Sequence, residues 1–335
     1  MIEDIIISNL ANIQQISLEK PAKINIIIGE NDSGKTMLLK ALYMMTKSVE
    51  EYKRGKDQRT FKEVINDKIY WTFQVNNIGD IVRKGSRENT TLHMKLDGKS
   101  IDIKLSASAS KSVGSAMTES SGRNKNSIFL PAKEVLSLFN VIKKSRFIDK
   151  EFGFDDTYLD LVVSLEKSSK QGNNFKDFSK GKKILQELIR GRIEFHDGEW
   201  IFHKGNMKIP IHSTAEGIKK IAILDRLLTN RTLTPGSILF IDEPESVLHP
   251  KAIIEFLDIL TLLSKRGVQI FMATHSFFVL KKMMIVAKKE KMDIPVISMG
   301  SSAEPLIYNL AEGMPDNPIV DVSIDLYEEE LDLVL

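Results

Sequence analysis

The chain has 335 residues, with 47 Lys and Arg residues against 45 Asp and Glu residues and a formal net charge of +2. This balance excludes a strongly basic, histone-like protein but not a local basic patch. Because the sequence contains no cysteine, it excludes disulfides, cysteine-ligated zinc and thiol catalysis. The first residues lack the basic start and apolar run of a signal peptide, and no apolar run is long enough to span a bilayer. We therefore expect a soluble, cytoplasmic protein that is not associated with a membrane.

The N-terminal part predicts two strands and a helix around a glycine-rich turn. Residues 2–7 and 24–28 are short, isoleucine-rich runs of the kind that form strands. The second run leads directly into the turn, and residues 36–45 then place their apolar side chains on one helical face.

The next stretch has three compositions in succession. Residues 46–68 are polar and rich in Lys and Arg, which favours a solvated helix or loop, with a nucleic-acid patch as the alternative. From residue 69 to residue 105 polar and apolar residues alternate around Asp97-Gly98, which predicts a small antiparallel sheet. Residues 106–127 are rich in Ser and Gly, and we expect a mobile loop there.

The remainder predicts a helical lobe followed by alternating strands and helices. Residues 127–131 resemble a short buried strand, residues 132–190 are mostly helical in pattern, and residues 192–211 resemble two short strands. Helices are expected at 215–228, 250–264 and 277–289, and strands at 238–241, 268–273 and 295–299. Such alternation is typical of a mostly parallel sheet with helices on its faces.

We therefore expect an α/β fold with a mostly parallel sheet flanked by helices, an antiparallel β subdomain and a helical lobe. We divide the chain into an N-terminal part (residues 1–130), a helical lobe inserted at residues 131–190, and a C-terminal part (residues 191–335). The last of these ends in an acidic tail from Asp321 onward.

The glycine-rich turn, Gly29–Thr36, has the spacing G-x-x-x-x-G-K-[ST]. In such a loop successive backbone N–H groups point at phosphate oxygens, and the helix that follows presents its positive end to the same anion. Lys35 would reach the β- and γ-phosphates, and the Thr36 hydroxyl would bind Mg²⁺. We expect the nucleotide-binding residues of this loop to be Asn31, Ser33, Gly34, Lys35 and Thr36. A turn that binds nothing is the alternative, and the flanking strand and helix disfavour it.

A second motif follows a buried strand. Residues 237–245 read Ser-Ile-Leu-Phe-Ile-Asp-Glu-Pro-Glu, so two acids stand at the carboxyl end of four apolar residues. Open parallel sheets bind ligands beyond that end. Asp242 would hold Mg²⁺, and Glu243 would polarise a water molecule for attack on the γ-phosphate. The alternative is a simple exit from strand to turn.

Four stretches together resemble an ABC-type P-loop ATPase of the group that contains SMC proteins, RecF and the OLD (overcoming lysogenization defect) ATPases. These stretches are Gly29–Thr36 (Walker A), Ser213–Lys220 (signature region), Ile238–Pro250 (Walker B and D-loop) and Ala273–Ser276 (switch histidine). The run Asp-Glu-Pro-Glu at 242–245, followed by Leu-His-Pro at 248–250, is especially similar to the OLD-type, AAA_15/AAA_21-labelled ATPases. The opening residues 5–18 also resemble the first hairpin of that group.

The resemblance implies a mechanism in which two heads pair head-to-tail around two ATP molecules. The signature of one head would then complete the Walker A site of the other. His275 would contact the γ-phosphate, whereas the residues alone favour a buried core histidine. Ser246 falls where the D-loop serine would lie, and a residue at the entry of the next helix is the alternative.

The signature region departs from the family pattern, which is Ser-x-Gly followed by a basic residue. Gly217 and Lys220 fit, but Ala215 stands two positions before Gly217. The adjacent Ser213 and Thr214 would supply a hydroxyl if the register slips. The resemblance implies that Ser213 and Gly217 contact the ATP of the opposing head. The alternative is a plain helix with Thr214 as its N-cap. Gln74 is only a weak match to the family's Q-loop.

The sequence also lacks features that other members of the group carry. No sustained heptads separate Walker A from the signature, so no SMC-type coiled-coil arm is expected. About 60 residues follow His275, too few for the Toprim nuclease domain of the longer OLD nucleases. An effector on a separately encoded chain is therefore expected.

We expect an ATPase that uses ATP and Mg²⁺ and that forms a homodimer or a higher homo-oligomer. It would switch a partner nuclease or toxin, and the resemblance suggests bacterial anti-phage defence. The alternative is a DNA-binding ATPase of the RecF or SMC-head kind, motivated by lysine clusters near residues 143–146, 180–183 and 281–289. A P-loop kinase is a third reading, and Glu243 and His275 argue against it.

Overall fold

A six-stranded sheet forms the centre of the computed structural model, which describes residues 1–168, 176–300 and 305–334. The strand order is β14-β13-β3-β12-β11-β7. All neighbours are parallel except β13 and β14. The strands are β3 (Ile24–Gly29), β7 (Ser127–Leu130), β11 (Ile238–Asp242), β12 (Gln269–Ala273), β13 (Pro295–Met299) and β14 (Leu306–Asn309).

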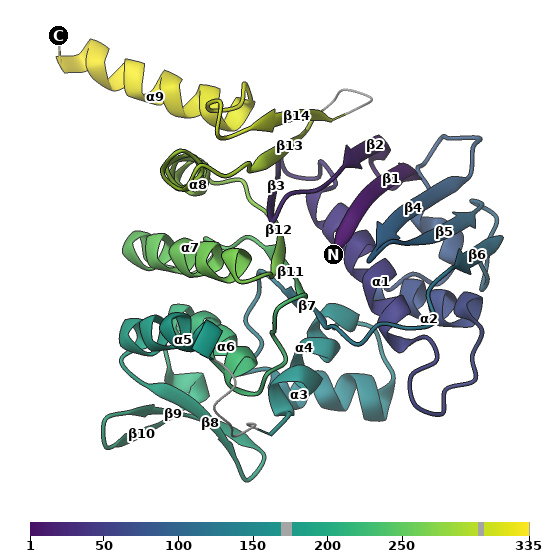
Figure 1. Ribbon diagram of the computed structural model, residues 1–335, viewed down its shortest axis with the longest axis horizontal. Helices are drawn as coiled ribbons and strands as arrows, with labels where there is room; N and C mark the ends of the chain where they lie inside the picture. The colour runs from purple at the N-terminus through teal and green to yellow at the C-terminus, as the bar shows by residue number, and fades with distance from the viewer. Residues whose placement is uncertain (169–175, 301–304, 335) are drawn as a thin grey trace.

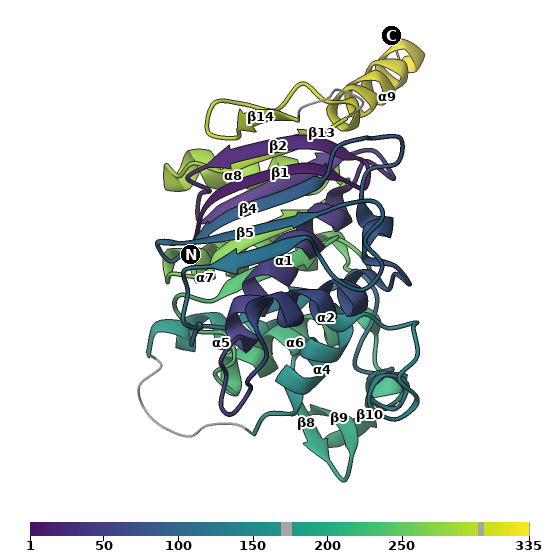
Figure 2. The same cartoon turned by 90° about the vertical axis from the view of Figure 1, so that its right-hand side faces the viewer.

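A second, antiparallel sheet of five strands in the order β2-β1-β4-β5-β6 stands beside the first. Helix α1 (Lys35–Glu51) runs between the two sheets, as Figures 1 and 2 show. The strands are β1 (Ile2–Leu10), β2 (Ile13–Glu19), β4 (Thr90–Leu96), β5 (Lys99–Leu105) and β6 (Ser115–Thr118).

The central strands bury both faces. In β3, Ile27 packs with α1 and the antiparallel sheet, whereas Ile26 and Ile28 pack into the core on the other side. This is the two-residue period of a strand that is covered by helices on one face and by α1 on the other. Phe240 and Phe271, from β11 and β12, stack on the α1 side with ring centroids 5.6 Å apart.

Helices cover the face of the central sheet that is turned away from α1 (Figure 1). They are α6 (Glu216–Thr229), α7 (Pro250–Lys265) and α8 (Phe277–Glu290), with α4 (Asp156–Glu166) and α5 (Lys176–Ile189) beside them. A three-stranded sheet of β8 (Arg192–His196), β9 (Glu199–Lys204) and β10 (Met207–Pro210) lies below these helices in Figure 1. The remaining helices are α2 (Phe61–Phe73), α3 (Phe139–Lys143) and α9 (Pro318–Val334). Within the described ranges, no helix is long and apolar enough to cross a lipid bilayer.

The expected α/β fold is confirmed, with its mostly parallel sheet and its antiparallel β subdomain. The predicted elements from residue 215 to residue 299 are confirmed to within two residues at each end. The division into parts at residues 130 and 190 stays a proposal. Residues 169–175 of the proposed lobe lie outside the described residues.

One predicted strand region is wrong. Residues 69–73 belong to α2, where Phe61, Ile65 and Ile69 recur at helical spacing and are buried. The helix begins with a capping box. The Thr60 side chain accepts a hydrogen bond from the Glu63 backbone N–H, and the Glu63 side chain accepts one from the Thr60 backbone N–H. The short alternation at 71–75 is therefore only local, and the buried helical stripe decides the structure.

Three further predictions need correction. Residues 46–51 continue α1 instead of lying in solvent, and Thr46, Ser48 and Glu50 are buried. The expected loop at 106–127 contains β6, and its Arg123 side chain is only 4% exposed because it pairs with Glu50 and Asp97. Residues 192–210 form three strands instead of two, since each of the two predicted turns joins a separate pair.

Buried ion pairs explain why the polar end of α1 is buried. The Lys68 ammonium of α2 lies 2.7 Å from Glu51 of α1 and 2.9 Å from Asp156 of α4. The Tyr43 hydroxyl of α1 donates to Asp160 at 2.6 Å. Buried charges are tolerated where they are paired in this way. These contacts attach α4 to α1 and α2.

Candidate nucleotide-binding site

The phosphate loop is built at the point where β3 turns into α1. Gly29 and Gly34 have φ angles of 150° and 96°, in the region that favours glycine. A Cβ atom at Gly29 would lie 2.2 Å from the Met299 carbonyl oxygen, so no other residue fits there. The Asn12 side chain donates to the Asp32 carbonyl at 2.7 Å and ties the loop to the turn between β1 and β2.

Lys35 and Thr36 begin α1 and point to different partners. The Lys35 ammonium donates to the carbonyl oxygens of Gly29 at 2.9 Å and Glu30 at 2.7 Å, so it lies inside the loop. Burial lowers the pKa of Lys35, and the charges of Asp242, Glu243 and Glu245 oppose that lowering. The Thr36 hydroxyl donates to both Asp242 carboxylate oxygens, at 3.0 and 3.2 Å. The two predicted magnesium ligands are therefore in contact.

Two further predicted loop residues differ in exposure. Asn31 is exposed, whereas the Ser33 hydroxyl oxygen is buried and has no hydrogen-bond partner among the described residues. Since a buried hydroxyl without a partner is costly, the Ser33 hydroxyl is suited to bind a ligand in the loop.

Asp242 and Glu243 end β11 at the same edge of the sheet. Burial raises the pKa of Asp242, and its bond with Thr36 works in the opposite direction. Glu243 has φ of 49°, a strained conformation for a residue with a side chain. Its N–H donates to the Ala273 carbonyl at 2.9 Å, and its carbonyl accepts from the Lys220 ammonium at 2.6 Å. Both peptide groups are thus fixed by neighbouring elements.

His275 follows β12 and lies beside Glu243. Its Nδ1 atom is 3.4 Å from Glu243 Oε1, and its side chain is 50% exposed. This exposure excludes the alternative of a buried core histidine. The structure therefore brings Lys35, Thr36, Asp242, Glu243 and His275 together at the carboxyl ends of β3, β11 and β12.

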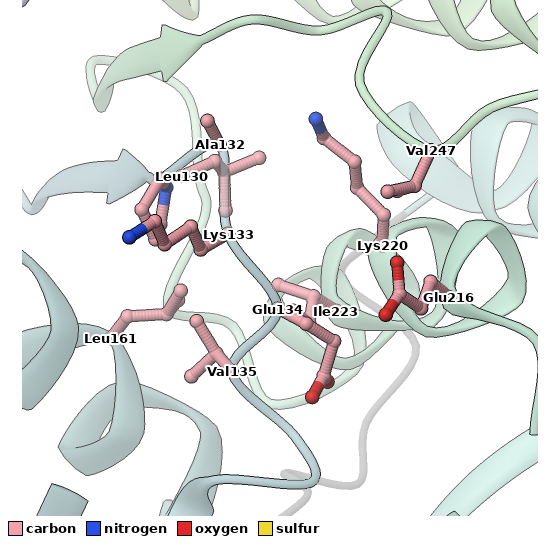
Figure 3. Close-up of a pocket in the computed structure, with 11 residues that line it drawn as sticks. Leu130, Ala132, Lys133, Glu134, Val135, Leu161, Glu216, Lys220, Ile223 and Val247 are labelled. Atoms are coloured by element: carbon pink, nitrogen blue, oxygen red, sulfur yellow. The ribbon is translucent and has the colours of Figure 1, made fainter. Parts of the chain in front are cut away.

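Lys220 joins α6 to the turn that follows β11. Its ammonium also donates to the Ser246 hydroxyl at 3.0 Å, and that hydroxyl donates to the Ala132 carbonyl at 2.9 Å. Figure 3 shows Lys220 on α6 between Ala132 on one side and Val247 on the other, and all three line a small pocket. Ser246 is not a helix-entry residue, because α7 begins at Pro250 with His249 as its N-cap.

The signature region lies at the start of α6. Ala215 is the N-cap and makes no side-chain cap bond, so the alternative of a helix capped by Thr214 is wrong. The Thr214 hydroxyl instead donates to the Pro210 carbonyl at 3.3 Å. Ser213 is exposed in a short 3₁₀ turn, and Gly217 lies in the first turn of α6.

Sequence reasoning missed some residues of this region and misplaced one. Lys40 lies one turn after Thr36 and pairs with Asp155 at 2.6 Å. Its spacing of four residues from Thr36 on a helix could have indicated this. Gln74 ends α2, where its side chain accepts from the Gly153 N–H at 3.2 Å. This hydrogen bond joins Gln74 to the segment that precedes α4 and not to the phosphate loop.

The oxygen donors of the site fit Mg²⁺. Thr36 supplies a hydroxyl and Asp242 a carboxylate, and such hard oxygen ligands are those that Mg²⁺ prefers. Nowhere in the described residues, this site included, is there a group of three or more His, Asp or Glu side chains that could hold a metal ion on its own. One or two protein ligands suffice for Mg²⁺ bound with a nucleotide, because phosphates and water supply the rest.

The fold and the phosphate loop define an ABC-type P-loop ATPase of the SMC and RecF group. The family model described as "AAA domain, putative AbiEii toxin, Type IV TA system" matches residues 24–281. The chain therefore belongs to this AAA_21 family.

Curated relatives are named DNA replication and repair protein RecF. The Lysinibacillus sphaericus (strain C3-41) protein is 27% identical over 281 residues, which cover 75% of this chain and 66% of the relative. The Staphylococcus epidermidis (strain ATCC 12228 / FDA PCI 1200) protein is 27% identical over 203 residues, 56% of this chain and 49% of the relative. The chain thus spans about half to two thirds of the length of these relatives.

Solved structures with the same fold include two SMC heads. The SMC head bound to the C-winged helix domain of ScpA has a TM-score of 0.55 at 13% identity, covering 92% of this chain and 97% of that chain. The Pyrococcus furiosus SMC head with an extended coiled coil, bound to the C-terminal domain of ScpA, has a TM-score of 0.54 at 12% identity, covering 98% of each chain.

Because Lys220 is buried, we expect the free energy of unfolding to depend on its protonation and therefore on pH. Burial lowers the pKa of Lys220 from 10.5 to about 8. Between these two values the unfolded chain holds a proton that the folded chain has released, so the contribution of Lys220 to the free energy of unfolding rises with pH. We expect urea unfolding to show a difference between the wild type and Lys220→Met that changes by about 2 kcal/mol from pH 7.5 to 9.5. Identical pH dependence in the two proteins would contradict the burial of the ammonium.

Proposed function

We propose that this protein binds and hydrolyses ATP with Mg²⁺ and acts as a switch subunit that controls a separate protein effector. The observation that carries the proposal is the contact of Thr36 with Asp242, beside Glu243 and His275. Phosphoryl transfer to water needs a phosphate loop, side chains that hold Mg²⁺ and a base. Candidates for all three lie here at one edge of a sheet.

Each residue has a proposed role. Asn31, Ser33, Gly34 and Lys35 would hold the phosphates, and Thr36 and Asp242 would hold Mg²⁺. The ion would neutralise charge that develops on the phosphates. Glu243 would orient and deprotonate the attacking water. Its side chain is 37% exposed, which leaves the carboxylate accessible to a water molecule.

We propose that ATP closes a head-to-tail homodimer. Ser213 and Gly217 would then face the nucleotide of the second copy, as in the family that the sequence resembles. The first turn of α6 presents N–H groups and the positive end of the helix dipole at this position. Lys220 connects the same helix to Glu243 within one copy.

The partner is proposed to be a protein encoded separately, a nuclease or a toxin. The AAA_21 description mentions a putative AbiEii toxin, which supports a setting in cytoplasmic defence against phage. The similar SMC heads are bound to domains of ScpA, a separate protein, which supports engagement of a second chain by a head of this fold.

A second candidate is a DNA-binding ATPase in repair, and the curated names of the RecF relatives favour it. Of the lysine clusters that motivate it, Lys143 pairs with Glu166 at 2.6 Å and Lys282 with Asp258 at 2.6 Å. Part of their charge is therefore neutralised within the chain, which reduces the support from these clusters.

The roles of Lys35 and Glu243 separate binding from hydrolysis. We expect Lys35→Ala to weaken ATP binding at least tenfold, because a hydrogen bond to a charged group contributes about 1.5–3 kcal/mol. We expect Glu243→Gln to bind ATP normally and to release phosphate about 10²–10⁴-fold more slowly. Calorimetric titration and phosphate release, with and without Mg²⁺, test both. Rapid turnover in Glu243→Gln would remove Glu243 as the base.

Dimer closure tests the role of Gly217. We expect Gly217→Asp to bind ATP but to stay monomeric in light scattering with ATP in the Glu243→Gln background, since its carboxylate would face the γ-phosphate. A Cβ atom here would lie 3.0 Å from the Val247 carbonyl, so Gly217→Ala is the control for crowding alone. If both variants fail to close, crowding explains the result; an unaltered dimer in Gly217→Asp would contradict the assignment.

Purification from native cells distinguishes the two candidate functions. We expect tagged Glu243→Gln protein, isolated with ATP and Mg²⁺, to carry a stoichiometric second protein that is absent from Lys35→Ala preparations. Mass spectrometry and the absorbance ratio at 260 and 280 nm identify the cargo. Nucleic acid without a second protein would favour the DNA-binding candidate instead.

A further inference from the structure

Glu245 connects the end of β11 to the loop that carries His275. Its side chain is only 12% exposed. One carboxylate oxygen, Oε1, accepts a hydrogen bond from the Thr274 hydroxyl at 2.7 Å and another from the His275 N–H at 3.3 Å. Glu245 therefore holds two consecutive residues of a loop that is separated from it by a whole helix and strand.

The contact continues into the next helix. The Thr274 hydroxyl accepts from the Ser276 N–H at 3.0 Å, and the Ser276 side chain caps α8 by accepting from the Val279 N–H. Glu245, Thr274 and Ser276 thus form a chain of hydrogen bonds from the end of β11 to the start of α8. Thr274 is fully buried, so the loss of its acceptor would leave a buried hydroxyl without compensation.

The imidazole of His275 depends on this chain for its place. Its Nδ1 atom is 3.4 Å from Glu243 Oε1 and 3.8 Å from Glu245 Oε1. Because half of the side chain is exposed, packing alone does not fix the ring. The hydrogen bond from the His275 N–H to Glu245 fixes the backbone position of His275. The imidazole then lies against the Glu243 carboxylate.

The burial of the second carboxylate oxygen of Glu245 does not stabilise the fold. Glu245 Oε2 is buried and has no hydrogen-bond partner among the described residues. A buried polar atom in this state costs free energy. The charge of Glu245 opposes, without reversing, the lowering of the Lys35 and Lys220 pKa values by burial, whereas the contacts with the His275 loop are made by its Oε1 atom alone.

We propose that Glu245 is a positioning residue, which holds the loop of Thr274 and His275 so that the imidazole stays against Glu243. This inference rests on the proposed ATPase function. Glu245 acts through His275 and is not itself in contact with the reacting atoms. Its oxygen serves as an acceptor, so a glutamine, whose side-chain oxygen is also an acceptor, preserves the arrangement.

Kinetics with a conservative variant test the proposal. We expect Glu245→Ala to lower kcat for ATP hydrolysis by up to about 100-fold, the cost of a displaced catalytic group, with KM for ATP changed less than about threefold. Glu245→Gln restores kcat to within about threefold of the wild type. Glu255→Ala, on α7 and outside this loop, is the control. A wild-type kcat in Glu245→Ala, or a Glu245→Gln variant as slow as Glu245→Ala, overturns the proposal.

Hydrogen exchange gives a readout that does not require turnover. In the full-length protein without nucleotide, we expect amide exchange of residues 273–277 to rise at least about fivefold in Glu245→Ala, since a bond worth roughly 1 kcal/mol is lost. Exchange stays at the wild-type rate in Glu245→Gln and Glu255→Ala. Unchanged exchange in Glu245→Ala overturns the proposal. If the wild type does not hydrolyse ATP, the proposed function fails, while this exchange still decides the role of Glu245.

Discussion

The parallel register of β3, β12 and β11 is the constraint on which the candidate site depends. Ile27 pairs with Ala273, and Ala273 pairs with Asp242, so β11 and β12 end at one level and β3 continues two residues further to Gly29. The chain leaves these strands as the phosphate loop, the Glu243 segment and the His275 loop. Thr36 and Asp242, 206 positions apart, meet because of this register. A slip of β11 by one residue would turn the Asp242 side chain to the opposite face of the sheet and separate it from Thr36 of α1.

Local patterns predicted most of the residues at this edge. The phosphate loop is defined by its own spacing, and Asp242 and Glu243 by the apolar strand before them, so neither needed knowledge of distant contacts. His275 has no such local signal and was placed by resemblance to a family. The links made by Lys220 and Glu245 could not be predicted, because they depend on how three loops pass one another beyond the sheet. The acidic run at 242–245 was the only hint of the second link.

Some of the errors in the fold come from charged residues that are buried in ion pairs. Glu50 and Lys68 look like surface residues in sequence, yet each is buried and paired with a residue that is distant in the chain, Arg123 and Asp156 respectively. Composition indicates solvent for such residues, and only tertiary pairing reverses it. Helix α2 was missed for a related reason, although the Thr60–Glu63 capping box was a readable signal for its start.

Two further contacts join α1, which carries part of the candidate site, to α4. Its first turn carries Lys35 and Thr36, Lys40 pairs with Asp155 at the start of α4, and Tyr43 donates to Asp160 of the same helix. Helix α1 is therefore connected to α4 by two direct side-chain contacts rather than only through loops. On the opposite side of the sheet edge, Lys220 and Glu245 attach α6 and α8 to Glu243 and His275. The candidate site is thus connected to four helices: α1 carries Lys35 and Thr36, Lys40 and Tyr43 join α1 to α4, Lys220 joins α6 to Glu243, and the Glu245–Thr274–Ser276 hydrogen bonds lead to α8.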